Sequence, residues 1–249
     1  MKLKNKSALI TGSNRGIGFA ILKKFAKEGC NIIAHSRNEN AEFKAKCKEI
    51  ESKNNISIDH VYFDLLDTEV LKKEIKSIIK TKVPIDILIN SAGIIHGGLF
   101  QMSPIKDIKN VFDVNFFGML EVTQLVSKYM LRKKSGDIIN IASIAGIDLS
   151  PGNCAYGTSK AAMIAFSKTL SKELSSYGIK VNVIAPSLTD TDMANTKEAT
   201  KERDLLAEGK NFMRMVNPEE IADLACFLCS NSASFINGQI IRIDGGNTF

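Results

Sequence analysis

The chain has 249 residues, of which 44% are hydrophobic, and a formal net charge of +6 at pH 7. A chain of this length can bury one substantial core, and no Pro/Gly/Ser-rich linker, low-complexity tract or internal repeat divides it. It lacks the apolar run of about 18 residues that a membrane-spanning helix requires, and its charged start is too poor in apolar residues for a secretory signal. We therefore expect a soluble cytoplasmic protein with a single domain over residues 1–249 and no membrane partner.

The charged residues and the cysteines bear on two further classes of function. Lysines are spread along the chain rather than massed on one segment, which predicts a solvated surface and no nucleic-acid partner. The five cysteines are scattered, as is typical of a reducing compartment. Cys226 and Cys229 form a CxxC pair within an apolar helical stretch, so we interpret them as buried side chains. The three histidines show no metal-ligand spacing, and we expect no metal site.

The first predicted elements are a strand, a glycine-rich turn and a helix. Residues 7–10 are apolar, residues 11–18 read TGSNRGIG, and a helical pattern continues to Glu28. Glycines let the backbone approach a pyrophosphate, and the free amides of a helix N-terminus bind its charge. The turn therefore predicts a nucleotide-phosphate site, although its spacing is Gly-x-x-x-Gly-x-Gly rather than the commoner Gly-x-Gly-x-x-Gly. The expected cofactor contacts are Gly12, Ser13, Asn14, Arg15, Gly16, Ile17 and Gly18.

A second buried strand is predicted over residues 31–38, and its end carries Ser36 and Arg37. In a dinucleotide fold the tip of this strand meets the adenosine ribose, where an acidic residue binds the 2′-hydroxyl of NAD. No acid is present here, and Arg15 stands in the nearby glycine turn. Because two guanidinium groups suit a 2′-phosphate, we expect NADP(H) to be bound, with Ser36 and Arg37 in contact with it. The alternative is that either arginine is only a surface charge.

The next elements alternate between helix and strand: a helix over residues 39–53, a strand over 57–65, a helix over 67–80 and a strand over 85–93. Asp64 lies at the tip of the third strand, where it is well placed to accept a hydrogen bond from an adenine amino group. The alternative is a helix-capping or turn role for Asp64. Small residues after the fourth strand let a cofactor lie against the backbone. The cofactor contacts expected from this part of the chain are Asp64, Leu65, Asn90, Ala92 and Gly93.

The helical region that follows carries a single amide side chain, Asn115, in the otherwise apolar run of residues 111–119. A buried amide needs hydrogen-bond partners. Asn115 is therefore either satisfied by backbone groups or poised at a site.

A fifth strand is predicted over the apolar residues 138–142, with Ser143 at its tip, and Tyr156 and Lys160 then open a helix. Residues four apart lie on one helical face, so these two side chains stack one turn apart. A phenol ordinarily titrates near about 10, and a neighbouring ammonium lowers its pKa. A serine hydroxyl donates a hydrogen bond to a carbonyl oxygen that gains charge. The combination favours proton transfer to or from a carbonyl or alcohol oxygen; the alternative is an ordinary amphipathic helix.

The last part of the chain predicts a sixth strand over residues 180–186, ended by a proline, and a seventh over residues 238–246. The polar segment 187–216 between them is typical of a mobile lid over a site. A helix then begins at Asn217 with a cap, a first-turn proline and a capping-box glutamate. The cofactor contacts expected here are Pro186 and Thr191.

Alternating strands and helices with right-handed crossovers predict an α/β fold: a doubly wound, Rossmann-type parallel sheet of seven strands with helices on both faces. Ligands bind such sheets at the carboxyl ends of the strands. The residues singled out at or near these ends are Gly12, Ser36, Arg37, Asp64, Asn90, Ser143 and Pro186. Their shared position predicts one site along one edge of the sheet.

The chain resembles the short-chain dehydrogenase/reductase family nearly end to end. The motifs that carry the resemblance are TGSNRGIG, NSAG, VNFFG, the spacing from Ser143 to Tyr156, YGTSK, VNVIAP, TDM and the final PEEIADLACFLCSNSASFINGQIIRIDGG. The resemblance implies that Tyr156 is the catalytic acid/base, that Lys160 holds the nicotinamide ribose and lowers the Tyr156 pKa, and that Ser143 polarises the substrate carbonyl. It also implies that Asn115 anchors a water linking Lys160 to solvent, and that the chain forms a homotetramer or a dimer.

Within the family, the C-terminal third resembles the 3-oxoacyl-(acyl-carrier-protein) reductases. Three positions depart from their pattern: residues 95–97 are Ile-His-Gly where Thr-Arg-Asp is usual, Ser187 replaces a glycine, and Tyr177 replaces a basic residue. We expect an NADPH-dependent reductase that acts on a small-molecule or carrier-bound ketone. The alternatives are a reductase or dehydrogenase of a sugar, polyol or other secondary alcohol, and a non-catalytic NADP-sensing protein.

Overall fold

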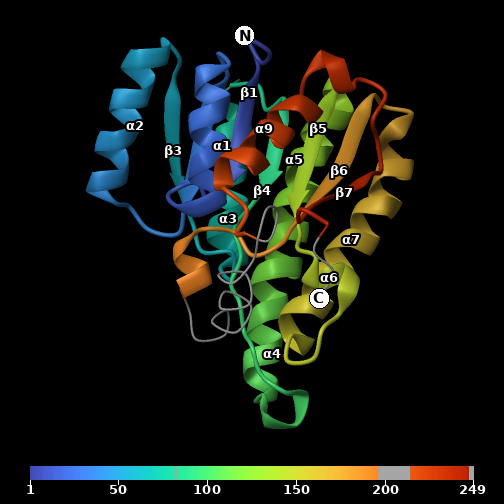
Figure 1. Cartoon of the computed structure of the whole chain (residues 1–249). Coiled ribbons are helices and arrows are strands. Elements are labelled where there is room, and N and C mark those ends of the chain that lie inside the picture. The colour runs from blue at the N-terminus through green and yellow to red at the C-terminus, as the bar shows by residue number, and fades with distance from the viewer. Residues whose placement is uncertain (82, 196–213, 247–249) are drawn as a thin grey trace.

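The computed structural model describes residues 1–81, 83–195 and 214–246 of the chain. In this part of the chain seven strands form one parallel sheet in the order β3-β2-β1-β4-β5-β6-β7 (Figure 1). The strands are β1 (Ser7–Thr11), β2 (Asn31–Ser36), β3 (Ile58–Tyr62), β4 (Ile87–Asn90), β5 (Gly136–Ile141), β6 (Ile179–Pro186) and β7 (Ile240–Ile243). The predicted seven-stranded parallel sheet is confirmed.

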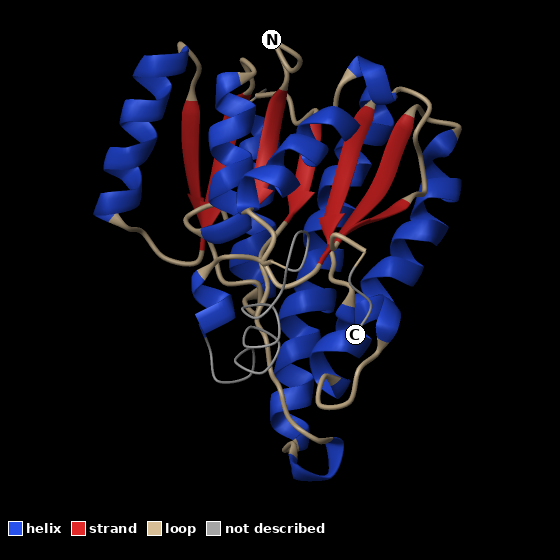
Figure 2. Cartoon of the chain, in the orientation of Figure 1, coloured by secondary structure: helices blue, strands red, loops and turns tan. Residues whose placement is uncertain are grey.

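Helices cover both faces of this sheet (Figure 2). Those on one face are α1 (Gly16–Lys27), α2 (Ala41–Asn54) and α9 (Pro218–Leu228), and those on the other are α3 (Thr68–Lys80), α5 (Met119–Lys133) and α7 (Cys154–Ser175). The remaining described helical pieces are α4 (Ile105–Phe112), a π-helical segment (Asp113–Gly118), α6 (Ala145–Asp148) and short 3-10 turns at Phe100–Met102, Asp192–Asn195 and Asn231–Ala233. No helix within the described ranges is long and apolar enough to cross a bilayer.

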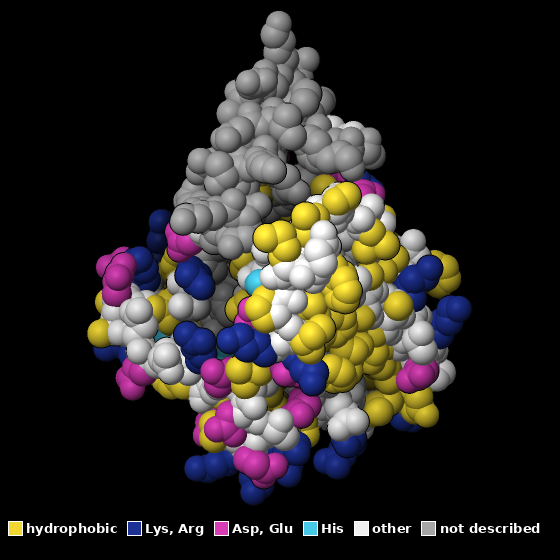
Figure 3. Space-filling model, turned by 90° about the horizontal axis from the view of Figure 1, so that it is seen from below, with side chains coloured by type: hydrophobic (Ala, Val, Ile, Leu, Met, Phe, Trp, Pro, Cys, Tyr) yellow, Lys and Arg dark blue, Asp and Glu magenta, His cyan; other side chains and the backbone are white. Residues whose placement is uncertain are grey.

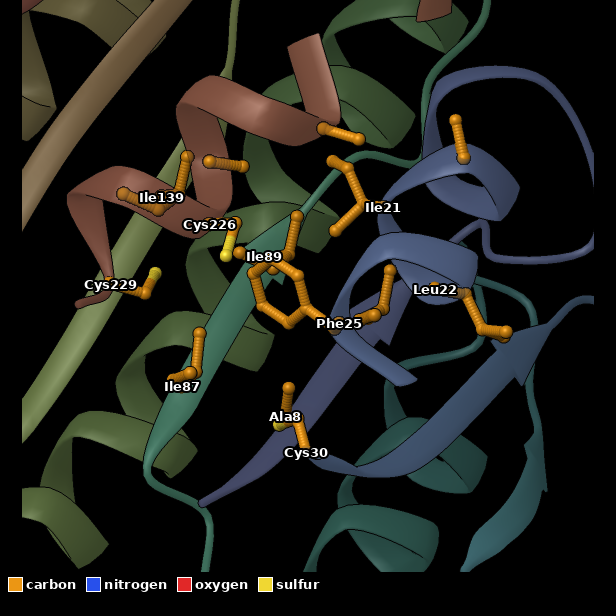
Figure 4. Close-up of a cluster of buried hydrophobic side chains, with 14 of the residues drawn as sticks. Ala8, Ile21, Leu22, Phe25, Cys30, Ile87, Ile89, Ile139, Cys226 and Cys229 are labelled. Atoms are coloured by element: carbon orange, nitrogen blue, oxygen red, sulfur yellow. The ribbon is translucent and has the colours of Figure 1, made fainter. Parts of the chain in front are cut away.

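Alternate residues of each strand face opposite cores, because side chains in a strand alternate between the two faces of the sheet. In β1, Ile10 belongs to the core under α1 and α9, and Leu9 to the core under α3 and α5. Phe25 of α1 is fully buried in the first core, where Cys226 and Cys229 also lie (Figure 4). Burial raises the pKa of both thiols. The interpretation of the CxxC pair as buried side chains is confirmed.

The predicted lid over residues 187–216 lies largely outside the described residues. Its described ends are hydrogen-bonded to each other: the Asp190 amide donates to the Val216 carbonyl, and the Val216 amide donates to the Leu188 carbonyl, both at 2.9 Å. The chain before and after the undescribed stretch therefore meets beside the carboxyl end of β6.

The helix α9 begins with the cap that the sequence predicts. The Asn217 side chain accepts a hydrogen bond from the Glu219 amide at 3.1 Å, and the Glu220 carboxylate accepts one from the Asn217 amide at 2.9 Å. Pro218 occupies the first turn, where its missing N–H costs no hydrogen bond. These contacts satisfy donors that a helix N-terminus otherwise leaves open.

An ion-pair network closes the opposite edge of the sheet, at the amino ends of the strands. Asp137 of β5 is 7% exposed and accepts from Lys6 at 3.1 Å and from Lys180 at 3.2 Å. The Lys6 ammonium also donates to the Cys229 carbonyl, and the Lys180 ammonium to the Leu228 carbonyl. One carboxylate thus anchors two lysines that hold the C-terminal end of α9 against the sheet.

Replacing Asp137 with alanine is expected to lower the free energy of unfolding by about 3 kcal/mol, because two partly buried ammonium groups then lose the carboxylate that balances their charge. Urea denaturation of Asp137→Ala against the wild type measures the change. The control is Asp223→Ala on α9: Asp223 pairs with Lys24 at 2.9 Å, but its side chain is 65% exposed, so its removal should cost less than about 1 kcal/mol. Equal effects of the two variants would contradict the assigned role of Asp137.

Candidate active site

The carboxyl ends of the strands point to one side of the sheet, where the long connecting loops gather (Figure 2). The glycine turn after β1, the loops after β2 to β6 and the start of α7 all meet this edge. Seen from this side, several Lys and Arg side chains border a hollow in the surface, and hydrophobic side chains gather next to it (Figure 3). This edge of the sheet is therefore the place of the candidate site.

Two glycines of the glycine turn pack too closely against backbone atoms to leave room for a side chain. Gly12 has a φ of +66°, and a Cβ there would lie 2.9 Å from the Ala92 Cα atom. A Cβ at Gly18 would lie 2.2 Å from the Gly12 carbonyl oxygen. Helix α1 begins at Gly16 without a side-chain cap, so its first amides have no side-chain acceptor. Bare glycine backbone beside open helix amides suits a phosphate group.

Not every residue of the turn offers its side chain to a ligand. Ser13 is fully buried, and both its amide and its hydroxyl donate to the His35 carbonyl, at 2.9 and 3.0 Å. Asn14 and Arg15 are exposed, and Ile17 lines a cavity described below. Ser13 therefore shapes the turn, and its neighbours face outward.

The end of β2 presents cations and no carboxylate of its own. Arg15 and Arg37 are exposed, and neither forms an ion pair with another described residue. Ser36 is buried, and its hydroxyl donates to the Asn38 carbonyl at 2.9 Å. Asp64 accepts a hydrogen bond from the Leu66 amide at 3.0 Å, which is the turn role that the sequence left open. Its role toward adenine stays a prediction.

Two of the predicted cofactor contacts, Asn90 in β4 and Leu65 after β3, have buried side chains. Asn90 is 3% exposed and donates to Thr123 at 2.9 Å and to Asn140 at 2.7 Å, while its Oδ1 atom has no described donor. Leu65 is buried against Gly118, where a Cβ would come within 2.8 Å of it. For these two residues, the surface left for a cofactor is chiefly backbone.

Lys160 and Tyr156 lie together at the start of α7. Lys160 is only 4% exposed, its ammonium donates to the Ile141 carbonyl at 2.9 Å, and it sits 5.7 Å from the centre of the Tyr156 ring. Burial lowers the pKa of Lys160 to about 8. The group is therefore still mostly protonated at neutral pH, and a desolvated cation lies beside the phenol.

Asn115 occupies a π-helical segment, Asp113–Gly118, that joins α4 directly to α5. Its Oδ1 atom accepts from the Ile94 amide and its Nδ2 atom donates to the Ile94 carbonyl, both at 2.8 Å. The backbone therefore satisfies this amide, which was one of the two interpretations from the sequence. A Cβ at Gly93 would lie 3.1 Å from Asn115 Oδ1 and 3.6 Å from the Lys160 ammonium, so Asn115 is also close to the lysine.

A cavity of about 120 Å³ brings the remaining predicted residues together. Its lining includes Ser143, Tyr156, Pro186 and Thr191. The Ser143 hydroxyl oxygen accepts from the Ala145 amide at 3.1 Å, which leaves its own proton available to a ligand. A larger cavity of about 920 Å³ opens on the other side of Thr191, along the start of α1. The Ser143 hydroxyl, the Tyr156 phenol and the glycine turn therefore lie along one edge of the sheet.

Three residues that shape the candidate site were not predicted from the sequence. Thr11 accepts hydrogen bonds from the Ser91 and Ala92 amides at 3.0 and 3.2 Å. Its position as the first residue of the glycine turn could have pointed to this role. His35 binds the same turn, and its signal was its place directly before Ser36. Arg242, discussed next, had no local signal because its partner is far away in the sequence.

Arg242 of β7 ties the end of the chain to the Ser143 loop. Its two terminal nitrogens bind the two Asp148 oxygens at 2.8 Å each, and its Nε atom donates to Asp244 at 2.5 Å. Asp148 closes α6, which begins two residues after Ser143, and it lines the same cavity. Bidentate pairs of this kind fix orientation as well as distance.

The chain matches known proteins in sequence and in fold. Residues 6–202 match the family described as short chain dehydrogenase. The chain is 36% identical over 244 residues to the 3-oxoacyl-(acyl-carrier-protein) reductase FabG of Chlamydia muridarum, with 98% of each chain covered. It is 38% identical over 248 residues to the protein of that name from Aquifex aeolicus, with 99% of this chain and 98% of the relative covered. A crystal structure assigned as a gluconate dehydrogenase from Agrobacterium tumefaciens superposes with a TM-score of 0.90 at 25% identity, covering 98% of this chain and 96% of that one.

The buried position of Lys160 leads to a titration experiment. In protein labelled with ¹³C-lysine, a side-chain resonance absent from Lys160→Met should titrate with a midpoint of about 8. Because this pKa lies below the unfolded value, burial of the cation opposes folding at pH values below 8, and the penalty fades as the pH rises toward 10.5. A Lys160 midpoint at the ordinary value of about 10.4 would contradict the desolvated environment.

Proposed function

Because the chain belongs to the short-chain dehydrogenase family, we propose that this oxidoreductase is an NADPH-dependent reductase of ketones, most like the 3-oxoacyl-(acyl-carrier-protein) reductases. The observation that carries the proposal is the buried Lys160 ammonium beside Tyr156, at a cavity that Ser143 also lines. A protein that only senses NADP has no need of a desolvated lysine and a hydroxyl at the far end of the cofactor site, so we place the sensing alternative last.

NADP(H), when bound, supplies the hydride that reaches the carbonyl carbon. In the proposed mechanism Ser143 donates a hydrogen bond to the carbonyl oxygen as its charge grows, a contribution worth roughly 10²–10³ in rate. Tyr156 transfers its proton to the same oxygen as general acid, which contributes roughly 10²–10⁴. Lys160 stabilises the phenolate left behind, because an opposite charge held in a buried site is poorly screened.

The residues proposed to hold the cofactor divide along the sheet edge. The glycine turn from Gly12 to Gly18 takes the pyrophosphate, and Arg15 and Arg37 take a 2′-phosphate. Asp64 and Leu65 border the adenine. The residues proposed for the nicotinamide half are Asn90, Ala92, Gly93, Tyr156, Lys160, Pro186 and Thr191. Asn115 is proposed to position the turn at Ile94 next to Lys160, through its two bonds to that residue's backbone.

Exposed apolar side chains on the segment after β4 favour a substrate with an apolar chain over a sugar. The Gly98 amide donates to the Gly152 carbonyl at 2.7 Å, which places the segment after β4 against the loop before α7. This segment exposes Leu99, Phe100 and Met102 at 48%, 59% and 77%. An acyl chain can shield such side chains from water, whereas a polar sugar leaves them exposed to solvent. Tyr177, 45% exposed where a base is usual in the 3-oxoacyl reductases, weakens the case for carrier-protein docking.

A substrate panel tests the proposal. NADPH oxidation is followed with acetoacetyl thioesters, free 3-ketoesters, diketones and sugars, at matched protein concentration. We expect turnover of the acetoacetyl compounds and little with sugars. Turnover of sugars or polyols alone would replace this function with the second candidate. Tight NADPH binding without any turnover would favour the sensing protein.

Assembly as a homotetramer is proposed from the resemblance and from two exposed aromatic side chains. Phe117 lies at the junction of α4 and α5 and is 52% exposed, and Phe235 before β7 is fully exposed. Large aromatic side chains left in water are typical of surfaces that a second copy covers.

Replacing Tyr156 with phenylalanine should lower kcat by roughly 10²–10⁴-fold, because the ring remains and only the transferable proton is lost. The affinity for NADPH should change little. Steady-state kinetics and a fluorescence titration with NADPH measure the two effects. The control is Tyr177→Phe, which removes an exposed hydroxyl away from the cavity and should leave kcat unchanged. Activity retained in Tyr156→Phe would refute the assigned acid.

Replacing Arg37 with aspartate should shift the cofactor preference toward NADH by roughly tenfold to hundredfold, because a charge-assisted contact to the 2′-phosphate becomes a repulsion. The ratio of kcat/KM for NADPH to that for NADH measures the shift. Lys53→Asp, which makes the same change of charge at the far end of α2, is the matched control. A ratio unaltered in Arg37→Asp would mean that this arginine is only a surface charge.

A further inference from the structure

His35 is a buried histidine that contacts two loops at once. It lies in β2 directly before Ser36 and is 3% exposed. Its Nδ1 atom lies 3.1 Å from the Gly12 amide nitrogen, and its Nε2 atom lies 3.0 Å from the Phe63 carbonyl oxygen. The ring also packs on the Phe63 ring, with centroids 4.0 Å apart. Both ring nitrogens are thus used by backbone groups of other elements.

These contacts fix the tautomer of the ring. The Gly12 amide is a donor, so Nδ1 must accept and carries no proton. The proton of the neutral ring is then on Nε2, which donates to the Phe63 carbonyl. Burial lowers the pKa of His35 to about 4, and Asp64 is the nearby charge that opposes this effect. The ring is therefore neutral at physiological pH, with a fixed donor and a fixed acceptor.

The backbone of the same residue completes the link. The His35 carbonyl accepts from the Ser13 amide at 2.9 Å and from the Ser13 hydroxyl at 3.0 Å. Gly12 and Ser13, the first two residues of the glycine turn, are therefore both bound to His35. On its other side, Phe63 leads directly into Asp64 and Leu65. One residue connects the three loops that face the adenosine half of the proposed site.

We propose that His35 is a positioning residue for the dinucleotide, which holds the glycine turn, the Ser36–Arg37 end of β2 and the Asp64 turn in one fixed arrangement. The inference rests on the proposed function, because it concerns the binding of the same cofactor. A glycine turn has few side chains of its own to define its shape, and here the shape is defined from the neighbouring strand. His35 acts on the affinity for the cofactor and not on the transfer of the proton.

Two substitutions separate the two halves of the ring. In His35→Asn the side-chain oxygen replaces Nδ1 as the acceptor for Gly12, whereas in His35→Gln the amide nitrogen reaches toward Phe63 and the acceptor for Gly12 is lost. We expect His35→Gln to raise the Kd and the KM for NADPH by roughly tenfold, with kcat within about twofold of the wild type. His35→Asn should stay within about threefold in all three quantities.

If only packing mattered, His35→Asn would lose more NADPH affinity than His35→Gln, because asparagine is smaller and leaves the larger gap. The order expected here is the reverse. Equal NADPH affinity in the wild type and His35→Gln would overturn the inference and leave the proposed function intact. A wild-type protein that does not bind NADPH would overturn both. Should either variant fail to fold, ¹H–¹⁵N spectra of the wild-type imidazole decide: a proton on Nε2 and none on Nδ1 supports the inference, and the opposite tautomer overturns it.

Discussion

The buried ammonium of Lys160 is the constraint on which the rest of the site depends. A cation with 4% of its surface exposed has lost most of its hydration, and removing charge from water is costly unless partners replace the water. The partners here are the Ile141 carbonyl and the face of the Tyr156 ring. Two glycines pack closely around this residue: a Cβ at Gly93 would lie 3.6 Å from the ammonium, and one at Gly146 would lie 2.7 Å from the Lys160 backbone. The lysine is thus held with its ammonium beside the phenol.

In each half of the proposed site, one polar side chain is hydrogen-bonded to the backbone of a loop. Asn115 binds both backbone groups of Ile94, and His35 binds backbone groups of Gly12 and Phe63. In each case a rigid element carries a planar polar group that defines the shape of a loop with few side chains of its own. Such positioning matters because reactions between bound groups depend steeply on their mutual geometry.

Much of the fold could be predicted from the sequence because its signals are local. Apolar runs of four to eight residues bounded by turn residues predict buried strands, and the seven strands are found in these places. The cap of α9 consists of consecutive residues, from Asn217 to Glu220, and it forms as predicted. The glycine turn is equally local, since close packing at Gly12 and Gly18 leaves no room for a side chain.

What could not be predicted depends on partners distant in the sequence. The side-chain partners of Asn90 could not be predicted, because only the sheet and α5 bring Thr123 and Asn140 near its amide. The link from Arg242 to Asp148 spans 94 residues. His35 was judged only by metal-ligand spacing, because nothing in the sequence places its ring beside Gly12.

The account rests on hydride reaching a carbonyl carbon while Tyr156 protonates the oxygen. Its most direct test is a single-turnover reaction with NADPH deuterated at the transferable position and an acetoacetyl thioester, with the product analysed by mass spectrometry. The account predicts a 3-hydroxyacyl product with one deuterium on the carbinol carbon. NADPH that stays bound without forming such a product, or a product without deuterium, would contradict it.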